Sequence, residues 1–273
     1  MHQLARRFLF LYACIAFFLQ AQAQNVDART ASEVAMGGAV VSLGGAEFHQ
    51  ANPSAGANVE FCVGVSVNNR FSLGELSTAN IWSVVPLHKA RILAHISQFG
   101  SHVFQESLAE FGLARGFSPS FSMGLNFRYY QLASSQWEEN PAFFSPNLGV
   151  QYQTANWGVG ASVLNLFGQS VNQQLVDMDY RSSVKLGAHQ NFQQFRLSSQ
   201  IDYVSFSAIY ISIGLSYNIR NVISLQSGYQ GEGESLSFGM SYIKHKFKFD
   251  FAFSQHQYLG FSPSFAIIYT SSQ

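Results

Sequence analysis

Phenylalanine occupies every second position of the run FKFDFAFS, which extends from Phe247 to Ser254. Successive residues of a β-strand point to opposite faces of the sheet. The phenylalanines would therefore form one apolar face, and Lys248, Asp250 and Ala252 would lie on the other. The apolar face must be covered either by a protein core or by lipid.

The same alternation recurs along most of the chain. Val63, Val65 and Val67, for example, alternate with Gly64 and Ser66. Such a period of two residues indicates β-strands, and it predicts about fourteen of them, each near the 9–11 residues that a tilted membrane strand needs. The predicted strands are residues 57–68, 77–86, 90–99, 107–115, 120–131, 146–154, 157–166, 181–191, 195–204, 209–218, 222–230, 235–243, 247–255 and 259–269.

The first residues have the pattern of a secretory signal peptide. A basic start at Arg6 and Arg7 precedes an apolar run over residues 8–19, and Ala21 and Ala23 form an A-x-A cleavage pattern. The apolar run is shorter than the roughly 20 residues of a membrane-spanning helix. We therefore predict that residues 1–23 are a signal peptide that is removed on export.

The composition is that of a chain with an apolar surface. Charged residues make up 11% of the sequence and aromatic residues 15%, whereas typical soluble domains contain about 25% charged residues. Export, low charge and alternating strands favour an all-β fold, a transmembrane antiparallel up-and-down β-barrel in the outer membrane, formed by residues 57–273. Outer-membrane lipid is the expected partner. The formal net charge of zero gives no reason to expect nucleic acid. An exported soluble β-sandwich is the alternative, and the low charge argues against it.

The connections between the predicted strands fall into two groups. The stretches LASSQWEENPAFFS and FGQSVNQQLVDMDY are long, whereas HK, AN, IRN and KHK are short. Outer-membrane barrels have short periplasmic turns and longer outer loops, and a β-sandwich has no reason to sort its connections in this way. The loop lengths therefore favour the barrel independently of the strand pattern.

The strand face opposite the apolar one is rich in Gly, Ser, Asn and Gln, with scattered charges. A Lys or Arg that faced lipid at the membrane midplane would cost about 2–4 kcal/mol, so we place the charges in the lumen. Either they pair with one another and hold a plug, which we favour, or they line a substrate path. The predicted lumen-side charges are Glu60, Arg91, Arg128, Lys185, Arg196, Asp202, Lys248 and Asp250.

Residues 24–56 do not alternate. Glycine pairs at 37–38 and 44–45 interrupt an apolar stretch, and Asn52-Pro53 is a turn signal. A barrel of about fourteen strands leaves space inside, and larger barrels are often plugged. We predict that this segment folds into the lumen as a plug; the alternative is a periplasmic tail with little structure.

Two motifs in this segment, Met36-Gly37-Gly38-Ala39 and Asn52-Pro53, resemble the N-terminal signature of the FadL/PorV superfamily of outer-membrane proteins. Ser54 departs from the Asn-Pro-Ala form of the second motif. The resemblance implies a barrel of fourteen strands with the N-terminal segment inside.

The superfamily has two functional branches. The FadL-like branch takes up fatty acids and other hydrophobic compounds, and the PorV/PorQ-like branch handles cargo proteins in type IX protein secretion. The short chain and its AMGGAVVSLGG stretch look more like the PorV/PorQ-like branch. That resemblance implies an accessory role in secretion, with secretion-system components or cargo proteins as partners. The alternative is a passive transporter that binds a hydrophobic ligand.

No motif for catalysis, a metal or a cofactor stands out. The histidines lack the spacing of a zinc motif, and the sequence has neither C-x-x-C nor G-x-S-x-G nor a P-loop. We expect no enzyme, although a serine–histidine lipase is a question of geometry. Cys62 is the only cysteine left after signal removal, so it has no partner for an intramolecular disulfide.

The facing assignment makes a prediction about two neighbouring residues. Phe249→Arg should hinder barrel assembly, at a cost of about 2–4 kcal/mol near the midplane, whereas Lys248→Ser should be tolerated. Assembly is measured by the heat-dependent gel shift of the membrane fraction. Equal tolerance of both substitutions would overturn the assignment of faces.

Overall fold

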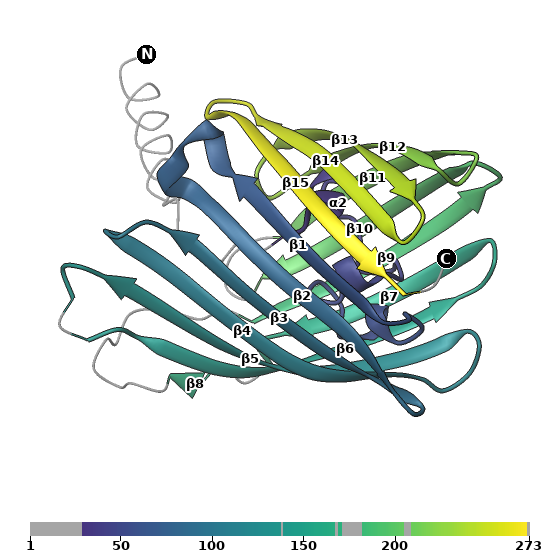
Figure 1. The fold of residues 1–273 in the computed structure, drawn as a ribbon, viewed down its shortest axis with the longest axis horizontal. Helices are drawn as coiled ribbons and strands as arrows, with labels where there is room; N and C mark the ends of the chain where they lie inside the picture. The colour runs from purple at the N-terminus through teal and green to yellow at the C-terminus, as the bar shows by residue number, and fades with distance from the viewer. Residues whose placement is uncertain (1–28, 138, 167–168, 171–181, 205–208, 272–273) are drawn as a thin grey trace, which may run out of the picture.

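Fourteen antiparallel strands close into a barrel (Figure 1). The computed structural model describes residues 29–137, 139–166, 169–170, 182–204 and 209–271, and the predicted signal peptide lies outside these ranges. The barrel strands of the described chain are β1 (Cys62–Asn69), β2 (Ser77–Leu87), β3 (Ala90–Gly100), β4 (Phe104–Gly116), β5 (Phe121–Ser134), β6 (Ala142–Gln153), β7 (Trp157–Leu164), β9 (Ser183–Phe192), β10 (Phe195–Val204), β11 (Ile209–Ile219), β12 (Ile223–Gln230), β13 (Ser235–Lys244), β14 (Phe247–His256) and β15 (Gly260–Thr270).

Pairing between the first and last strands closes the barrel. β1 pairs antiparallel with β15, with Val65 opposite Ile267, and each other barrel strand pairs with its neighbours along the chain. The short strand β8 (Gln169–Ser170) pairs only with the start of β6, so β7 pairs directly with β9. Closure removes the open edges that would leave backbone groups unpaired in lipid.

The predicted strands all correspond to observed strands, and the largest shifts in their bounds are at the starts of β1 and β6. β1 begins at Cys62 rather than at residue 57, and β6 begins at Ala142 rather than at residue 146. Because β5 also extends to Ser134, the predicted loop between the fifth and sixth strands shortens to residues 135–141. Most of the other long predicted loop falls outside the described residues.

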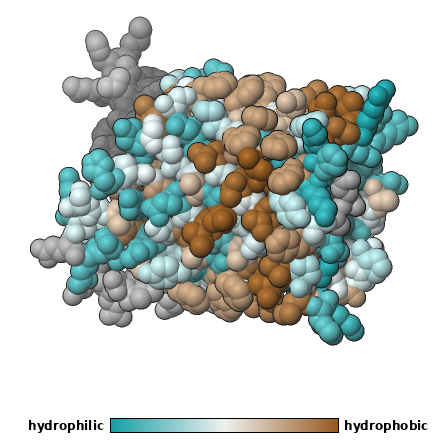
Figure 2. Space-filling view, in the orientation of Figure 1, coloured by the Kyte–Doolittle hydropathy of each residue, from teal (hydrophilic) through white to brown (hydrophobic). Residues whose placement is uncertain are grey.

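The phenylalanines of β14 face outward. Phe247 and Phe251 are 45% and 50% exposed, whereas Asp250 and Ala252 point inward and are buried. On the face drawn in Figure 2, hydrophobic side chains gather in a band across the middle, with hydrophilic residues toward both ends. This is the pattern of a surface that crosses a bilayer, and the phenylalanines of FKFDFAFS contact lipid.

Among the described residues, every helix is too short or too weakly apolar to cross a membrane.

The two ends of the barrel differ in their connections. Tight turns at residues 88–89, 154–156, 193–194, 220–222 and 245–246 lie at one end, which we call the short-turn end. His88, Gln193 and His245 have positive φ values there, as two-residue hairpin turns require. The opposite loop end carries the longer connections 70–76, which contains the 3-10 helices η3 (Arg70–Ser72) and η4 (Gly74–Leu76), and 135–141. By the rule for outer-membrane barrels, the short-turn end faces the periplasm.

Residues 29–57, which we call the plug segment, lie inside the barrel (Figure 1). The segment contains the helix α2 (Ala31–Ala35) and the 3-10 helices η1 (Ala46–Phe48) and η2 (Pro53–Gly56). α2 contacts β12 to β15, whereas η2 contacts β3 to β6. The segment thus bridges opposite walls, and its own small core consists of Met36, Val40, Leu43, Phe48, Ala51 and Ala55.

Inward-facing glycines of the strands mark where the plug segment touches the wall. A Cβ atom at Gly214 would lie 2.7 Å from the Met36 carbonyl oxygen, and one at Gly239 would lie 2.5 Å from the Ala35 Cβ. Gly37 of the plug has a φ of +61° and packs against the Tyr229 backbone, so it needs glycine for both reasons. The wall glycines that contact the plug are Gly124, Gly149, Gly160, Gly187, Gly214, Gly228 and Gly239.

The close packing of the plug segment on the wall glycines predicts that one added methyl group will displace the plug segment. A Cβ at Gly149 would clash with the Asn52 side chain, so Gly149→Ala should displace the plug segment and admit ions to the lumen. Planar-bilayer recordings in concentrated KCl should then show conductance steps that the wild type lacks. Gly74→Ala is the matched control, because a Cβ there meets nothing within 4 Å. Identical recordings from Gly149→Ala and the wild type would contradict the packing.

Candidate functional site in the barrel lumen

The inward side chains of β5 change character along the barrel axis. From the short-turn end to the loop end the inward positions are Ser122, Gly124, Asn126, Arg128, Tyr130 and Leu132. Gly124 touches the plug segment, the next two are polar, and the last two are apolar. The lumen beside β5 therefore has three levels, which we call the plug, the polar layer and the outer apolar cluster.

The outer apolar cluster lies inside the barrel near the loop end. Leu108, Tyr130 and Phe143 stand side by side on β4, β5 and β6, because the register pairs Tyr130 with both of the others. The rings of Tyr130 and Phe143 are stacked with centroids 6.2 Å apart. The cluster consists of Leu108, Tyr130, Leu132 and Phe143, with Phe104 and Trp137 packed against it.

One carboxyl group is buried beside this cluster. Glu106 points inward from β4 between Phe104 and Leu108, and the Tyr130 hydroxyl group hydrogen-bonds to it. Arg70, from the loop that follows β1, lies over the ring of Phe99, 5.4 Å from its centroid. The loop end of the lumen therefore combines apolar surface with a few fixed polar groups, as small-molecule sites commonly do.

The polar layer is centred on a buried ion pair. Arg128 Nε donates to Glu110 Oε1 at 2.5 Å, and His95 Nδ1 lies 3.5 Å from Glu110 Oε2. The His49 ring of the plug meets the His95 ring edge-on at a centroid distance of 5.9 Å. Burial lowers the pKa of His49 to about 4, and the nearby His95 acts in the same direction, so His49 is neutral at neutral pH.

Asparagine side chains extend the polar layer across β5, β6 and the end of β7. Asn147 Nδ2 donates to Asn126 Oδ1 at 2.7 Å, and Asn147 Oδ1 accepts from the Asn165 backbone N–H at 2.7 Å. Within the described residues, Asn126 Nδ2 and the Ser97 hydroxyl group are buried without a protein partner. The ion pair and these amide and hydroxyl groups make the polar layer a hydrophilic barrier below the outer apolar cluster.

Lys248 holds the plug segment to β14. Its Nζ donates to Glu47 Oε1 at 2.8 Å and to Ser32 Oγ at 3.0 Å, and it lies 3.2 Å from Asp250 Oδ2. Ser32 Oγ also donates to Asp250 Oδ2 at 2.5 Å. Burial tends to raise the pKa of Glu47, but the charge and hydrogen bond of Lys248 outweigh it and lower the pKa overall. We call this group the Lys248 anchor.

Amide side chains fix the middle of the plug segment. Gln200 Oε1 accepts from the backbone N–H groups of Val40 and Val41, at 3.0 and 2.8 Å. Asn52 Nδ2 donates to the Val41 carbonyl oxygen at 2.7 Å, and its Oδ1 caps η2 by accepting from the Ser54 N–H at 3.0 Å. Asn52 therefore links the start of η2 to the Val41 backbone of the same segment.

Of the predicted lumen-side charges, Arg128, Lys248 and Asp250 lie inward and belong to the two buried charge groups described above. Arg91 Nε donates to the Val59 carbonyl oxygen at 2.5 Å, where the plug segment leads into β1.

The three remaining strand charges lie on β9 and β10, with Arg196 next to the short-turn end and Lys185 and Asp202 nearer the loop end. Arg196 Nε donates to Asn191 Oδ1 at 2.9 Å, and Asp202 Oδ1 accepts from Gln200 Nε2 at 2.7 Å. The register places Lys185 directly opposite Asp202.

The placement of Glu60 on a strand face was wrong. Glu60 precedes β1, has no strand conformation and is exposed. The alternation of residues 57–61 continues that of β1, but Arg91 binds the Val59 carbonyl oxygen there.

Sequence reasoning missed Glu110 and Glu47. Glu110 could have been found, because it is inward-facing on β4 and the register pairs it with Arg128. Glu47 lies in the plug segment, where no strand period indicates which way a side chain points.

The described residues contain no metal site. Their His, Cys, Asp and Glu side chains form no group that could hold a metal ion. A serine–histidine contact does occur, since His189 Nδ1 lies 3.2 Å from Ser42 Oγ. Both residues are buried between the plug segment and the wall, so the Ser42 hydroxyl group is not positioned to meet a substrate.

No protein-family model and no curated protein matches the chain. Solved structures do match it. The toluene transporter TodX of P. putida has a TM-score of 0.67 at 13% identity, over 91% of this chain and 100% of that one. The Ralstonia pickettii toluene transporter TbuX gives 0.61 at 14%, over 90% and 99%. A Pseudomonas aeruginosa FadL homologue gives 0.59 at 10%, over 90% and 99%.

At such low identity these similarities establish a shared fold. The chain is a closed, plugged transmembrane β-barrel with the architecture of FadL-type outer-membrane transporters. The comparisons give no support to the PorV/PorQ-like branch that the N-terminal motif led us to expect.

The Lys248 anchor predicts the effect on stability of removing the Lys248 side chain. Its removal leaves Glu47 and Asp250 buried without their cation, so we now expect Lys248→Met to destabilise the barrel by roughly 3–5 kcal/mol. The earlier expectation that Lys248→Ser is tolerated does not fit this geometry. Urea unfolding of the protein in phospholipid vesicles measures the cost.

The triple variant Lys248→Met, Glu47→Gln, Asp250→Asn is the control, because it removes the stranded charges along with the cation. It should recover part of the loss. A triple variant less stable than Lys248→Met alone would show that the charges are not what destabilises the single variant.

Proposed function

We propose that this chain is a passive transporter of hydrophobic small molecules across the outer membrane. The observation that carries the proposal is the outer apolar cluster, a group of inward-facing apolar side chains near the loop end, separated from the plug segment by the polar layer. A barrel wall needs its apolar residues on the lipid face and not on the lumen face. Apolar residues on the lumen face at the loop end are therefore suited to receive an apolar solute from outside.

The layers below the cluster give the transporter a closed resting state. The polar layer and the plug segment lie across the path from the outer apolar cluster to the short-turn end. A solute that leaves the cluster for the periplasm therefore requires the plug segment to shift. Apart from its chain connection to β1, the plug is held by hydrogen bonds and ion pairs, so such a shift breaks no covalent bond.

The structural neighbours are consistent with this proposal. TodX and TbuX are toluene transporters, and their fold accommodates apolar solutes. For this chain we extend the proposal to an outer-membrane location after removal of residues 1–23, with residues 24–56 as the plug and residues 57–273 as the barrel. The secretion role stays a prediction that neither the lumen nor the comparisons support.

A binding assay tests the proposal. We expect the purified full chain to bind radiolabelled toluene or the fluorescent apolar probe N-phenyl-1-naphthylamine. Leu108→Asp should weaken binding about tenfold or more, because it replaces the buried apolar contact of one leucine with a charge. Ser216→Ala is the matched control, since Ser216 is also buried and inward-facing but lies on β11, away from the cluster on β4 to β6.

Cells that express the Leu108→Asp variant should take up less of the labelled solute than cells that express the wild type or the control variant. Equal binding by the wild type and Leu108→Asp would contradict a solute site in the outer apolar cluster. A surface proteome that loses exported proteins when this gene is deleted, with uptake unchanged, would favour the secretion role instead.

A further inference from the structure

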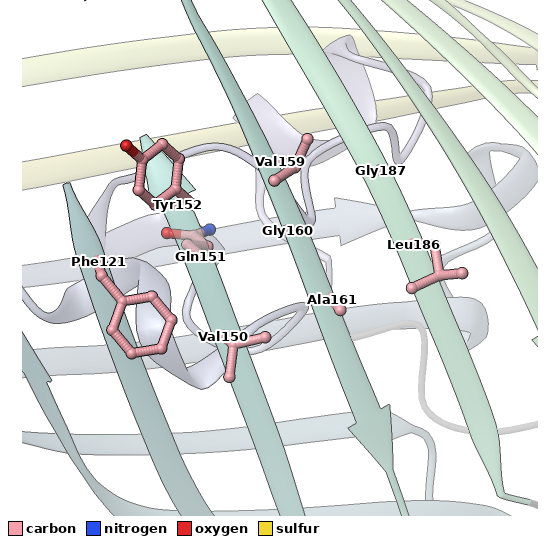
Figure 3. Close-up of a pocket in the computed structure, with 9 residues that line it drawn as sticks. All are labelled: Phe121, Val150, Gln151, Tyr152, Val159, Gly160, Ala161, Leu186 and Gly187. Atoms are coloured by element: carbon pink, nitrogen blue, oxygen red, sulfur yellow. The ribbon is translucent and has the colours of Figure 1, made fainter. Parts of the chain in front are cut away.

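A groove of about 340 Å³ lies on the barrel wall formed by β5, β6, β7 and β9 (Figure 3). Its side chains come from the outward, lipid-facing positions of these strands. They are Phe121, Val150, Tyr152, Val159, Ala161 and Leu186, and the backbone of inward-facing residues completes the floor. The groove therefore opens to the membrane and is separate from the lumen site.

The strand register explains why the wall is hollow at this place. One outward row runs across the strands through Met123, Val150, Ala161, Leu186 and Ile201. Ala161 is the only small side chain of this row, so a gap lies between Val150 and Leu186. In the next row toward the short-turn end, Tyr152 and Val159 are neighbours and form the side of the groove.

The wall behind the groove is supported from inside. A Cβ at Gly160 would clash with the Val41 carbonyl oxygen of the plug segment, and one at Gly187 would lie 2.5 Å from Val41 Cγ1. Here the strand backbone alone separates the plug from the lipid side. The plug thus holds the thin part of the wall in place, and the hollow on its outer face is a fixed feature.

The groove lies near the short-turn end, close to one membrane interface. Phe121 directly follows the turn at 117–120, and Tyr152 precedes the turn at 154–156. The ring of Tyr152 lies 5.6 Å from that of Trp157, which also faces outward. Tyrosine and tryptophan gather at the headgroup level of membranes, so this rim of the groove reaches the periplasmic headgroups.

We propose that the groove binds one acyl chain of a phospholipid of the periplasmic leaflet. The surrounding medium is hydrocarbon, the lining is apolar, and the rim next to the short-turn end carries the aromatic residues that meet headgroups. No charged side chain lines the groove in the described part of the chain. The site therefore recognises the acyl chain and not the headgroup charge.

Native mass spectrometry of the full chain, released from nanodiscs of palmitoyl-oleoyl phosphatidylethanolamine, tests this proposal. We expect the wild type to retain one phospholipid after the others dissociate. Ala161→Phe fills the gap in the row, so it should lose this species. Ala109→Phe is the matched control, an outward alanine on β4 between Ile96 and Tyr129, and it should keep the lipid.

Nanodiscs of the corresponding phosphatidylglycerol should give the same retention, because the headgroup is not bound. Heat-dependent gel shifts confirm that each variant is folded. The proposal would be overturned if Ala161→Phe retained the phospholipid as well as the wild type does. It would also be overturned if Ala161→Phe and Ala109→Phe lost the phospholipid equally. A dimer that Ala161→Phe abolishes would instead assign the groove to a second copy of the chain. None of these outcomes depends on what the lumen transports.

Discussion

Backbone N–H and C=O groups find no hydrogen-bond partners in the hydrocarbon of a membrane, so a sheet that crosses it must close on itself. The pairing of β1 with β15 meets this requirement. Once the sheet is closed, each strand has one face on lipid and one face on the lumen. The phenylalanines of β14 and the charges between them follow from that single constraint.

Closure also creates an interior that the strands alone do not fill. The plug segment fills it by two means. Wall glycines allow its backbone to approach closely, and buried polar side chains such as Gln200, Asn52 and Lys248 bind its backbone and its charges. A buried charge is costly unless it is paired, which is why Lys248 and Arg128 each contact a carboxylate. The plug segment does not reach the loop end, where the outer apolar cluster lies inside the barrel instead.

The strands and their faces could be predicted from the sequence because a period of two residues reports them directly. Lys248 and Asp250 were placed inward on that basis, and they lie inward. The same rule failed at Glu60, where the alternation of the sequence continues beyond the strand, which begins only at Cys62.

The layers of the lumen could not be predicted. Leu108, Tyr130 and Phe143 come together only through the axial register of three strands, and alternation does not fix that register. The wall glycines were visible as members of the polar face, but their common role required knowing the path of the plug segment. For the same reason the ion pair between Glu47 and Lys248 could not be predicted from the sequence.

The central claim is that residues 29–57 form a fixed plug inside a closed barrel. Hydrogen exchange of the membrane-embedded full chain, read by mass spectrometry, tests it most directly. The backbone N–H groups of Val40, Val41 and Ser54 are bound by buried side chains, so peptides from this segment should exchange as slowly as peptides from the barrel strands. Exchange at the rate of an unstructured chain across residues 29–57 would contradict the account and would return the segment to a periplasmic tail.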